Sequence, residues 1–254
     1  MNATILMTTA DLMVSTGLAR AGYEYVNSDD CWVLTCRNPA LAAEPPRSKC
    51  DDFKGPQRFD PKRFPDGIEA VVKHIHGKGL KMGLYTSASP FTCDGMAASC
   101  HYETYDATQW AKWGIDYMKE DACGGCRPEG KIADYKAMQD AIDATGAAMV
   151  FTIENDGTTS PGNQHGLVAD GAHGNARRIG HDIDAIWLSM VSLVDLGSGL
   201  WHFAHNDTGN GGWWNDFDMI EIGRGDFEPI NQHQLNMART HMTYWCICKA
   251  VMLL

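Results

Sequence analysis

The stretch Ile115-Asp116-Tyr117-Met118-Lys119-Glu120-Asp121 turns from apolar to charged, and the chain then breaks at Cys123-Gly124-Gly125. It predicts a short strand. A strand that is buried on both faces cannot hold unpaired charges, because burying one costs several kcal/mol. We therefore expect Lys119, Glu120 and Asp121 where the strand leaves the core and meets water. In barrels of alternating strands and helices, that rim houses the active site.

Five other strand-like stretches end in the same way, with polar residues directly after apolar ones. They are Tyr25-Val26-Asn27-Ser28-Asp29-Asp30, Leu84-Tyr85, Phe151-Thr152-Ile153-Glu154, Arg178-Ile179-Gly180-His181-Asp182 and Trp214-Asn215-Asp216. The carboxyl ends of parallel strands lie at one edge of the sheet, where α/β folds bind ligands. Six such ends therefore indicate one site.

Helical periodicity alternates with these strands along the chain. The expected strands are 23–27, 81–85, 115–121, 148–154, 176–179, 213–219 and 251–254. The expected helices are 4–20, 67–78, 105–113, 131–145, 184–196 and 232–248. This alternation predicts an α/β fold with a parallel sheet and right-handed crossovers. We expect a (β/α)8 TIM barrel over 1–254, as a single catalytic domain that lacks its first strand and is truncated at the last.

Composition excludes some classes of function. The 254 residues, 44% of them hydrophobic, provide enough material for one large domain. A formal net charge of -11 disfavours nucleic acid as a partner and suits neutral substrates such as sugars. No apolar run approaches the ~20 residues that span a bilayer, so no membrane partner is expected.

Cysteine usage indicates an oxidising compartment, since nine cysteines are many for a cytosolic enzyme. A disulfide between Cys36 and Cys50 could constrain a proline-rich loop that runs from residue 37 to 65. Asn2-Ala3-Thr4 and Asn206-Asp207-Thr208 match the glycosylation sequon. The chain opens without the basic and apolar regions of a signal peptide. We expect a secreted or lysosomal/vacuolar protein whose natural N-terminus is missing from this sequence.

Two carboxylates could cleave a glycosidic bond, one attacking the anomeric carbon while the other protonates the departing oxygen. Asp121 and Asp182 end non-adjacent strands and could converge across a barrel mouth. Lys119 points to the same side of its strand as Asp121 and could donate to a sugar hydroxyl. Arg178 offers a second cationic donor. The structural alternative is that Asp182 only caps the helix expected to begin at Asp184.

Six stretches carry a resemblance to a known family. They are Gly22-Tyr23-Glu24-Tyr25-Val26-Asn27-Ser28-Asp29-Asp30-Cys31-Trp32, Asp60-Pro61-Lys62-Arg63-Phe64-Pro65-Asp66-Gly67, His76-Gly77-Lys78-Gly79-Leu80-Lys81-Met82-Gly83-Leu84-Tyr85, Trp113-Gly114-Ile115-Asp116-Tyr117-Met118-Lys119-Glu120-Asp121, Gly180-His181-Asp182-Ile183 and Trp214-Asn215-Asp216-Phe217-Asp218-Met219. In this order they resemble glycoside hydrolase family 27, the α-galactosidases and α-N-acetylgalactosaminidases, over nearly the whole chain.

The resemblance implies roles for named residues. The family's enzymes are retaining, which makes Asp121 the nucleophile and Asp182 the general acid/base. The implied sugar-binding residues are Asp29 and Asp30 on the O4 and O6 hydroxyls, Lys119 on O3 and O4, Arg178 near O2, and Tyr85 in the pocket wall. A disulfide between Cys93 and Cys123 is implied as well, joining two loops at the rim.

The sequence departs from the family at several points. Ile153-Glu154-Asn155 stands where the family has Cys-Glu-Trp or Cys-Glu-Gly, and Gly174 stands near the missing partner cysteine. In the family, that segment contacts the substituent at C2 of the sugar. Glu154 is therefore expected to contact the sugar, and the choice between galactose and N-acetylgalactosamine stays open. The usual partner of Cys31 lies before residue 1. The family's C-terminal β-sandwich is also absent, so we expect a fragment or a truncated gene product.

Three further motifs have a structural and a functional interpretation. Cys123-Gly124-Gly125-Cys126 has the spacing of zinc or redox sites, but the sequence has no second such pair to complete a four-cysteine zinc site. A structural disulfide from Cys123 is therefore favoured, with Cys126 bonded to another cysteine, for example Cys100. His74-Ile75-His76 lies in a helical pattern whose alternate residues face different ways, which disfavours a metal. Trp32 could form a pocket wall, and Trp214 is expected in the core.

The leading hypothesis is a glycosidase that removes terminal α-linked D-galactose from an oligosaccharide or glycoconjugate through a covalent glycosyl-enzyme. It requires no metal or organic cofactor. One alternative is an α-N-acetylgalactosaminidase, and another is a catalytically impaired galactose-binding relative. A metal-dependent barrel hydrolase would be sensitive to chelators, and the sequence lacks a convincing ligand set for it.

Overall fold

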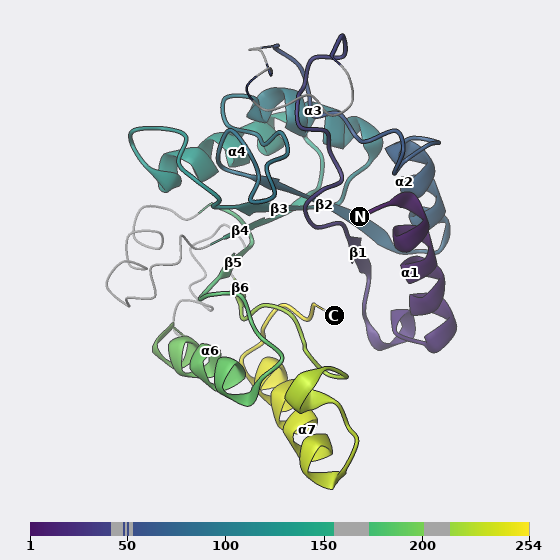
Figure 1. Cartoon of the computed structure of the whole chain (residues 1–254), viewed down its shortest axis with the longest axis vertical. Helices are drawn as coiled ribbons and strands as arrows, with labels where there is room; N and C mark the ends of the chain where they lie inside the picture. Colours follow the sequence, from purple (N-terminus) through teal and green to yellow (C-terminus); the bar gives the residue numbers. More distant parts are fainter. Residues whose placement is uncertain (42–47, 49, 51–52, 155–172, 201–213, 254) are drawn as a thin grey trace. The chain divides into compact units, whose positions relative to one another are not determined.

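The computed structural model describes residues 1–41, 48, 50, 53–154, 173–200 and 214–253 (Figure 1). Six strands form a sheet in which they follow one another in sequence order, β1 to β6. The chain divides into two compact units, Met1–Phe151 and Thr152–Leu254. The expected α/β class with a parallel sheet is confirmed. The single barrel domain over 1–254 stays a prediction.

The first unit is built on three parallel strands: β1 (Tyr25–Asn27), β2 (Lys81–Ser87) and β3 (Tyr117–Asp121). Val26 pairs with Met82, and Ser87 pairs with Asp121 at the carboxyl ends of β2 and β3. Parallel neighbours need crossover connections, and α2 (Ile68–Gly77) and α3 (Glu103–Trp113) supply them. The loops that follow β1, β2 and β3 therefore leave the sheet at one edge.

Helix α2 shows why this sequence forms a helix against a sheet. Its buried residues recur at helical spacing, which gives one continuous apolar face: Ile68, Val71, Val72 and Ile75. Helix α1 (Ala3–Thr16) packs against α2, and the Asn2 side chain caps it by accepting from the N–H of Ile5 at 2.9 Å. It ends at Gly17, which adopts a left-handed conformation with φ 90°.

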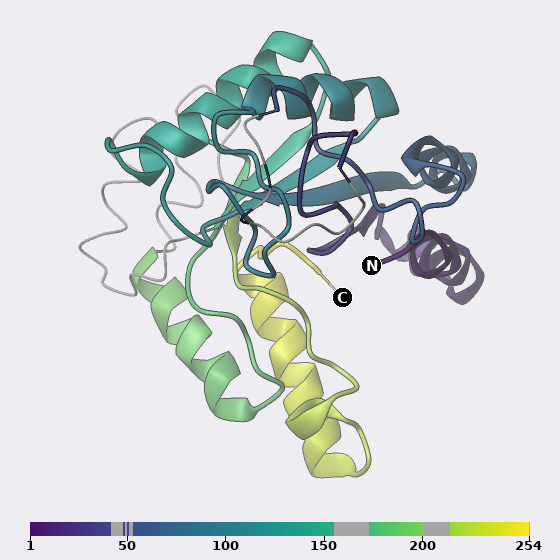
Figure 2. The same cartoon turned by 45° about the horizontal axis from the view of Figure 1, so that its top comes forward.

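Helices α3 and α4 (Lys131–Thr145) pack side by side over β2 and β3 (Figures 1 and 2). Between these helices and β3 lies Glu120, which is only 1% exposed. The prediction that Glu120 meets water is therefore wrong. Alternation along β3 turns Glu120 to the face opposite Lys119 and Asp121, and burial raises its pKa well above the usual range, with the charges of Glu103 and Asp134 adding to the effect.

The second unit contains the end of β4 (Val150–Ile153), with β5 (Ala176–Arg178) and β6 (Trp214–Asp216) beside it in parallel register. Two helices, α6 (Trp187–Leu200) and α7 (Gln232–Ile247), pack against each other. The core of this unit is a cluster of buried side chains from both helices and from the segments that follow β5, β6 and α7: Ile179, Ile183, Met190, Leu193, Leu200, Phe217, Ile220, Phe227, Ala238, Trp245 and Ala250.

Several boundaries differ from the expected ones. Val251–Leu253 form no strand, although the carbonyl of Leu253 accepts a hydrogen bond from the N–H of Ile220 at 2.7 Å. Six strands, not seven, are therefore found in the part of the chain that is described. Trp214 is 45% exposed, so its expected core position is wrong. No helix in the described ranges is long and apolar enough to cross a membrane.

Candidate active site

Asp121 is the last residue of β3 and is held at the carboxyl edge of the sheet in the first unit. Tyr85, on the neighbouring strand β2, donates a hydrogen bond from Oη to Oδ2 of Asp121 at 2.7 Å. The other oxygen, Oδ1, accepts from the N–H of Ala122 at 2.5 Å. Burial raises the pKa of Tyr85, and the charge of Asp121 raises it further, so the hydroxyl stays protonated and acts as a donor. The Asp121 carboxylate is thus fixed from two directions.

Lys119 lies two residues before Asp121 on the same face of β3. Its Nζ is 3.5 Å from Oδ2 of Asp29 and 5.2 Å from the centroid of the Tyr85 ring. Asp29 has a side chain that is 62% exposed, so this ion pair contributes little stability of its own.

Asp30 shapes the loop after β1. Its Oδ1 accepts from the N–H of Cys31 at 2.6 Å, and its Oδ2 accepts from the N–H of Asp94 at 3.0 Å, which ties this loop to the loop after β2. Asp29 in turn accepts from the N–H of Asp30 at 2.7 Å. The structure therefore brings the predicted residues of the first unit together at one edge of its sheet: Asp29, Asp30, Tyr85, Lys119 and Asp121.

The disulfide expected between Cys93 and Cys123 is present, with a Cα–Cα distance of 4.9 Å. It joins the loop after β2 to the loop that follows Asp121, and the sulfur of Cys93 lies 4.0 Å from Oδ2 of Asp121. Cys36–Cys50 and Cys100–Cys126 are also bonded, as the sequence suggested. Trp32 is fully buried and donates to the carbonyl of Tyr85 at 2.8 Å, so its expected place in a pocket wall is wrong.

Arg178, the last residue of β5, organises the site residues of the second unit. It is 3% exposed and contacts three carboxylates: Glu154 at 3.2 Å, Asp182 at 2.9 Å and Asp218 at 2.9 Å. Burial alone would lower the pKa of Arg178, but the charges of these neighbours and of Asp216 outweigh it and raise the pKa. The guanidinium is a permanent cation that holds the surrounding acids in place.

The Asp182 side chain is 92% exposed although it is bound to the buried Arg178. A fixed cation therefore orients a side chain that reaches solvent. The helix-cap alternative for Asp182 is not supported, since α6 begins at Trp187, whose N–H donates to Asp226 at 2.8 Å. The two ring nitrogens of His181 contact the carbonyl of Asp182 and the hydroxyl of Ser192 at 2.7 and 3.0 Å.

Asp218 is a site residue for which the sequence predicted no role. Its Oδ2 pairs with Arg178 and also accepts from the N–H of Ile183, next to Asp182, at 2.8 Å. Asp218 adopts a left-handed conformation, φ 71°, and its N–H donates to Oδ1 of Asp216. A strand followed by Asp-x-Asp is the signal that could have identified it, because the second carboxylate can fold back onto the strand end.

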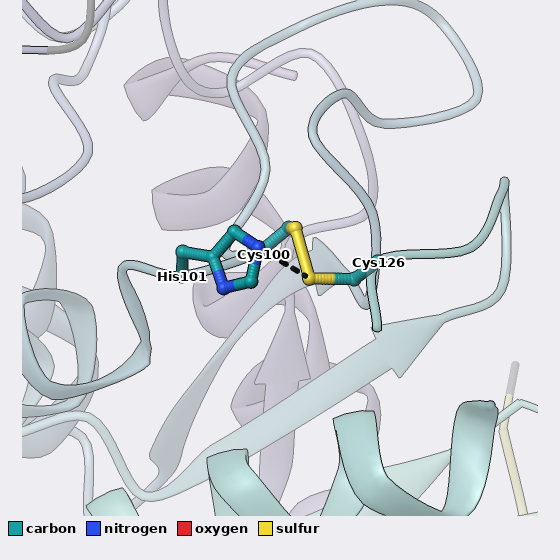
Figure 3. A group of neighbouring side chains, drawn as sticks. All are labelled: Cys100, His101 and Cys126. Carbon is teal, nitrogen blue, oxygen red and sulfur yellow. Dashed lines mark hydrogen bonds between the residues drawn. A yellow bond between two sulfur atoms is a disulfide. The ribbon is translucent and has the colours of Figure 1, made fainter. Parts of the chain in front are cut away.

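Three groups of side chains in the described part of the chain have metal-ligand spacing: Cys93 with Asp121 and Cys123, Cys100 with His101 and Cys126, and Asp30 with Cys31 and Asp94. In the first two groups the sulfurs are joined in disulfides, so they offer no thiolate. Figure 3 shows the second of these groups. In the third, burial raises the pKa of the Cys31 thiol to about 11, with the hydrogen bond to Asp94 adding to the shift. His74 and His76 pair with different carboxylates, Asp11 and Asp116.

Comparison with known proteins identifies the family to which this chain belongs. The family model described as "Alpha galactosidase A" matches residues 1–254. Alpha-galactosidase 3 of Arabidopsis thaliana is 36% identical, over 100% of this chain and 51% of its own length. Human alpha-galactosidase A is 34% identical, over 97% of this chain and 52% of its own length. The chain therefore spans about half the length of these curated relatives.

Solved structures agree on the fold. Alpha-galactosidase I of Mortierella vinacea superposes with a TM-score of 0.75 and 30% identity, covering 100% of this chain and 62% of that one. The Saccharomyces cerevisiae α-galactosidase superposes with a TM-score of 0.76, 24% identity and coverage of 100% and 55%. The parallel sheet described above is the one these structures share.

Proposed function

Because the chain belongs to the alpha-galactosidase A family, we propose that it carries the active-site residues of a retaining glycosidase that removes terminal α-linked D-galactose. The whole domain is then a TIM barrel, with the loops after β1 to β6 at its catalytic rim. One observation carries the proposal most directly. Asp121 ends a strand of the sheet, and its carboxylate is fixed by Tyr85 and by a disulfide-linked loop.

The proposed reaction uses two carboxylates in a double displacement. Asp121 attacks the anomeric carbon, and Asp182 protonates the departing oxygen. Asp182 then removes a proton from water, which hydrolyses the glycosyl-enzyme. The hydrogen bonds to both oxygens of Asp121 support its role, since they hold the nucleophile in one orientation. The exposure of Asp182 supports a role in proton exchange with the leaving group and with water.

Substrate binding is proposed for the remaining polar residues of the two strand-end clusters. Asp29 and Asp30 would accept hydrogen bonds from O4 and O6, and charge-assisted bonds of this kind are stronger than neutral ones. Lys119 would donate to O3 and O4, with the Tyr85 ring as part of the pocket wall. The short distances between Lys119, Asp29 and Tyr85 support a shared binding surface.

At C2 of the sugar we propose a hydroxyl rather than an acetamido group. Glu154 is 8% exposed and pairs with Arg178. The two residues expected near C2 therefore form a buried ion pair. A hydroxyl can exchange hydrogen bonds with both members, whereas an acetamido methyl group would face desolvated charge. α-N-Acetylgalactosaminidase activity is the alternative.

No metal or organic cofactor enters the proposed mechanism, which uses side chains alone. The partner is an α-galactoside oligosaccharide or glycoconjugate, and neither nucleic acid nor a membrane is expected. A secreted or lysosomal/vacuolar location is proposed, supported by the three disulfides among the described residues.

The test compares turnover of p-nitrophenyl α-D-galactoside and the matching α-N-acetylgalactosaminide by the wild-type chain, Asp121→Asn and Asp182→Asn. We expect turnover of the galactoside only, its loss in Asp121→Asn, and galactose binding retained in that variant by calorimetry. Asp116→Asn, directly before the start of β3, serves as a matched control. Wild-type protein that binds galactose without turnover would favour the non-catalytic relative, and faster turnover of the acetamido substrate would overturn the C2 assignment.

A further inference from the structure

Two disulfides join the same two loops in the first unit. Cys93–Cys123 and Cys100–Cys126 both connect the loop after β2 to the loop after β3, with Cα–Cα distances of 4.9 and 5.6 Å. A single bond would already hold these loops together. The surroundings of the two bonds differ in charge, which gives them different reactivity toward thiols.

Cys93–Cys123 lies against an acid and a phenol. Oδ2 of Asp121 is 4.0 Å from the Cys93 sulfur, and Oη of Tyr85 is 3.4 Å from the Cys123 sulfur. Thiol–disulfide exchange proceeds by attack of a thiolate and departure of a second thiolate. The carboxylate opposes both steps, because it repels an incoming anion and destabilises a departing one. Although Cys93 is exposed, this bond is electrostatically protected.

Cys100–Cys126 lies against donors instead. Nε2 of His101 is 3.8 Å from the Cys126 sulfur (Figure 3). Nη1 of Arg127 is 3.6 Å from the same sulfur. The His101 ring nitrogen and both sulfurs lie within 4.8 Å of one another. Arg127 also pairs with Glu103 and Asp134, so its charge is shared. Cationic groups near the Cys126 sulfur attract an anionic thiol to it, and the His101 ring, within 4.8 Å of the Cys100 sulfur as well, favours a departing Cys100 thiolate.

From this contrast we propose that Cys100–Cys126 is a thiol-exchange site that accepts small anionic thiols, and that it opens before Cys93–Cys123. Cys126 is half-buried, whereas Cys100 is 6% exposed, so attack falls on the sulfur of Cys126. The inference goes beyond the proposed glycosidase activity and does not depend on it.

The exchange balances as two substitutions at sulfur. A thiolate R–S⁻ attacks Cys126, an R–S–S–Cys126 bond forms, the bond to Cys100 breaks, and the Cys100 thiolate takes a proton from water or from the His101 ring. A second thiolate can attack the mixed disulfide, which releases R–S–S–R and the thiolate of Cys126. The protein disulfide is then reduced while two small thiols are oxidised.

Opening this bond leaves the end of β3 secured. Cys93–Cys123 remains, Tyr85 still donates to Asp121, and Asp134 still accepts from the N–H groups of Cys126 and Arg127 at 3.3 and 3.1 Å. The modified protein therefore stays folded and carries a reversible thiol adduct on the loop that follows Asp121.

The test treats the native chain with glutathione, which is anionic, or cysteamine, which is cationic, after the free cysteines Cys31, Cys246 and Cys248 have been blocked. Quenching with an isotopic alkylating agent and peptide mass spectrometry then give the opening rate of each disulfide. With glutathione we expect Cys100–Cys126 to open about tenfold faster than Cys93–Cys123, and Cys126 to carry the adduct. The ratio of the glutathione rate to the cysteamine rate should be higher at Cys126 than at Cys36–Cys50. The Cys36–Cys50 bond serves as an internal reference, because it corrects for the different intrinsic reactivities of the two thiols.

Two variants test the cause. His101 adopts φ 64°, a conformation that asparagine tolerates, so His101→Asn removes the ring without backbone strain. It should lower the glutathione preference at Cys126 about threefold, as should Arg127→Gln, while Cys36–Cys50 stays unchanged. Earlier opening of Cys93–Cys123 in the wild type would overturn the proposal. So would an anionic preference that persists in both variants.

Discussion

The Tyr85 hydroxyl donates a 2.7 Å hydrogen bond to Oδ2 of Asp121 across neighbouring strands β2 and β3. Burial keeps this hydroxyl protonated, so it acts as a permanent donor to the carboxylate. A nucleophile must be held in one orientation to react efficiently. Within the proposed mechanism, Tyr85 is therefore a positioning residue for Asp121.

Tyr85→Phe tests this relationship. The variant keeps the ring and loses only the hydrogen bond, which to a charged group is worth about 1.5–3 kcal/mol. We expect kcat for p-nitrophenyl α-galactoside to fall about ten- to a hundredfold. Tyr105→Phe, at a position 44% exposed on α3, should leave kcat unchanged. Equal kcat in both variants would show that Tyr85 does not position Asp121.

Asp218→Asn tests the support of Asp182. The substitution removes one of three carboxylates around the buried Arg178 and keeps an acceptor for the N–H of Ile183. We expect the free energy of unfolding to fall by about 1–3 kcal/mol and kcat to fall about tenfold. Denaturant titration and steady-state kinetics measure the two effects. Asp184→Asn, an exposed neighbour, is the control, and similar effects in both variants would contradict the role of Asp218.

Glu120→Gln should change how stability depends on pH. The pKa of Glu120 is raised above its ordinary value of 4.5 by burial and by nearby acids, so the folded state binds the proton more tightly than the unfolded state. This contribution to stability is fully present below pH 4.5 and declines as the pH rises through the folded pKa. Hydrogen exchange of β3 across that range should show a flatter pH dependence in Glu120→Gln. An unchanged profile would mean that Glu120 is ionised in the folded protein.

His241 gives the stability of the second unit a pH dependence opposite to that of Glu120. The ring is fully buried between Phe227 and Trp245, and neither nitrogen has a hydrogen-bond partner among the described residues. Burial lowers its pKa from 6.5 to about 4, so the unfolded state binds the proton first and stability falls as the pH drops from 6.5 toward 4. The full loss amounts to about 3 kcal/mol.

His241→Leu should therefore reduce the acid sensitivity of α7. We would follow hydrogen exchange of this helix between pH 7 and 4.5, with the exposed His233→Leu as the control. If the two variants respond to acid like the wild type, protonation of His241 does not limit the stability of this unit.

Much of the fold was predictable because its signals are local. The buried face of α2 follows from the spacing of Ile68, Val71 and Ile75, and the carboxyl end of β3 follows from the change to charge before Asp121. The last expected strand was wrong because a short apolar run such as Val251–Leu253 has the composition of a strand whether or not a neighbour pairs with it.

The site was predictable in part, for the same reason. Strand ends mark Asp121 and Arg178, but the environment of Glu120 depends on side chains from α3 and α4 that are distant in sequence. Asp218 was missed because its contacts with Arg178 and Ile183 arise only when a left-handed residue turns the chain back toward β5.

Asp121 is proposed as the nucleophile of a retaining galactosidase, and a covalent trap would identify the carboxylate that attacks the sugar. The chain would be incubated with 5-fluoro-α-D-galactosyl fluoride, digested and mapped by peptide mass spectrometry. We expect a fluorogalactosyl ester on Asp121 in the wild type and none in Asp121→Asn. A label on another carboxylate, or galactoside turnover that proceeds without any trapped ester, would contradict it.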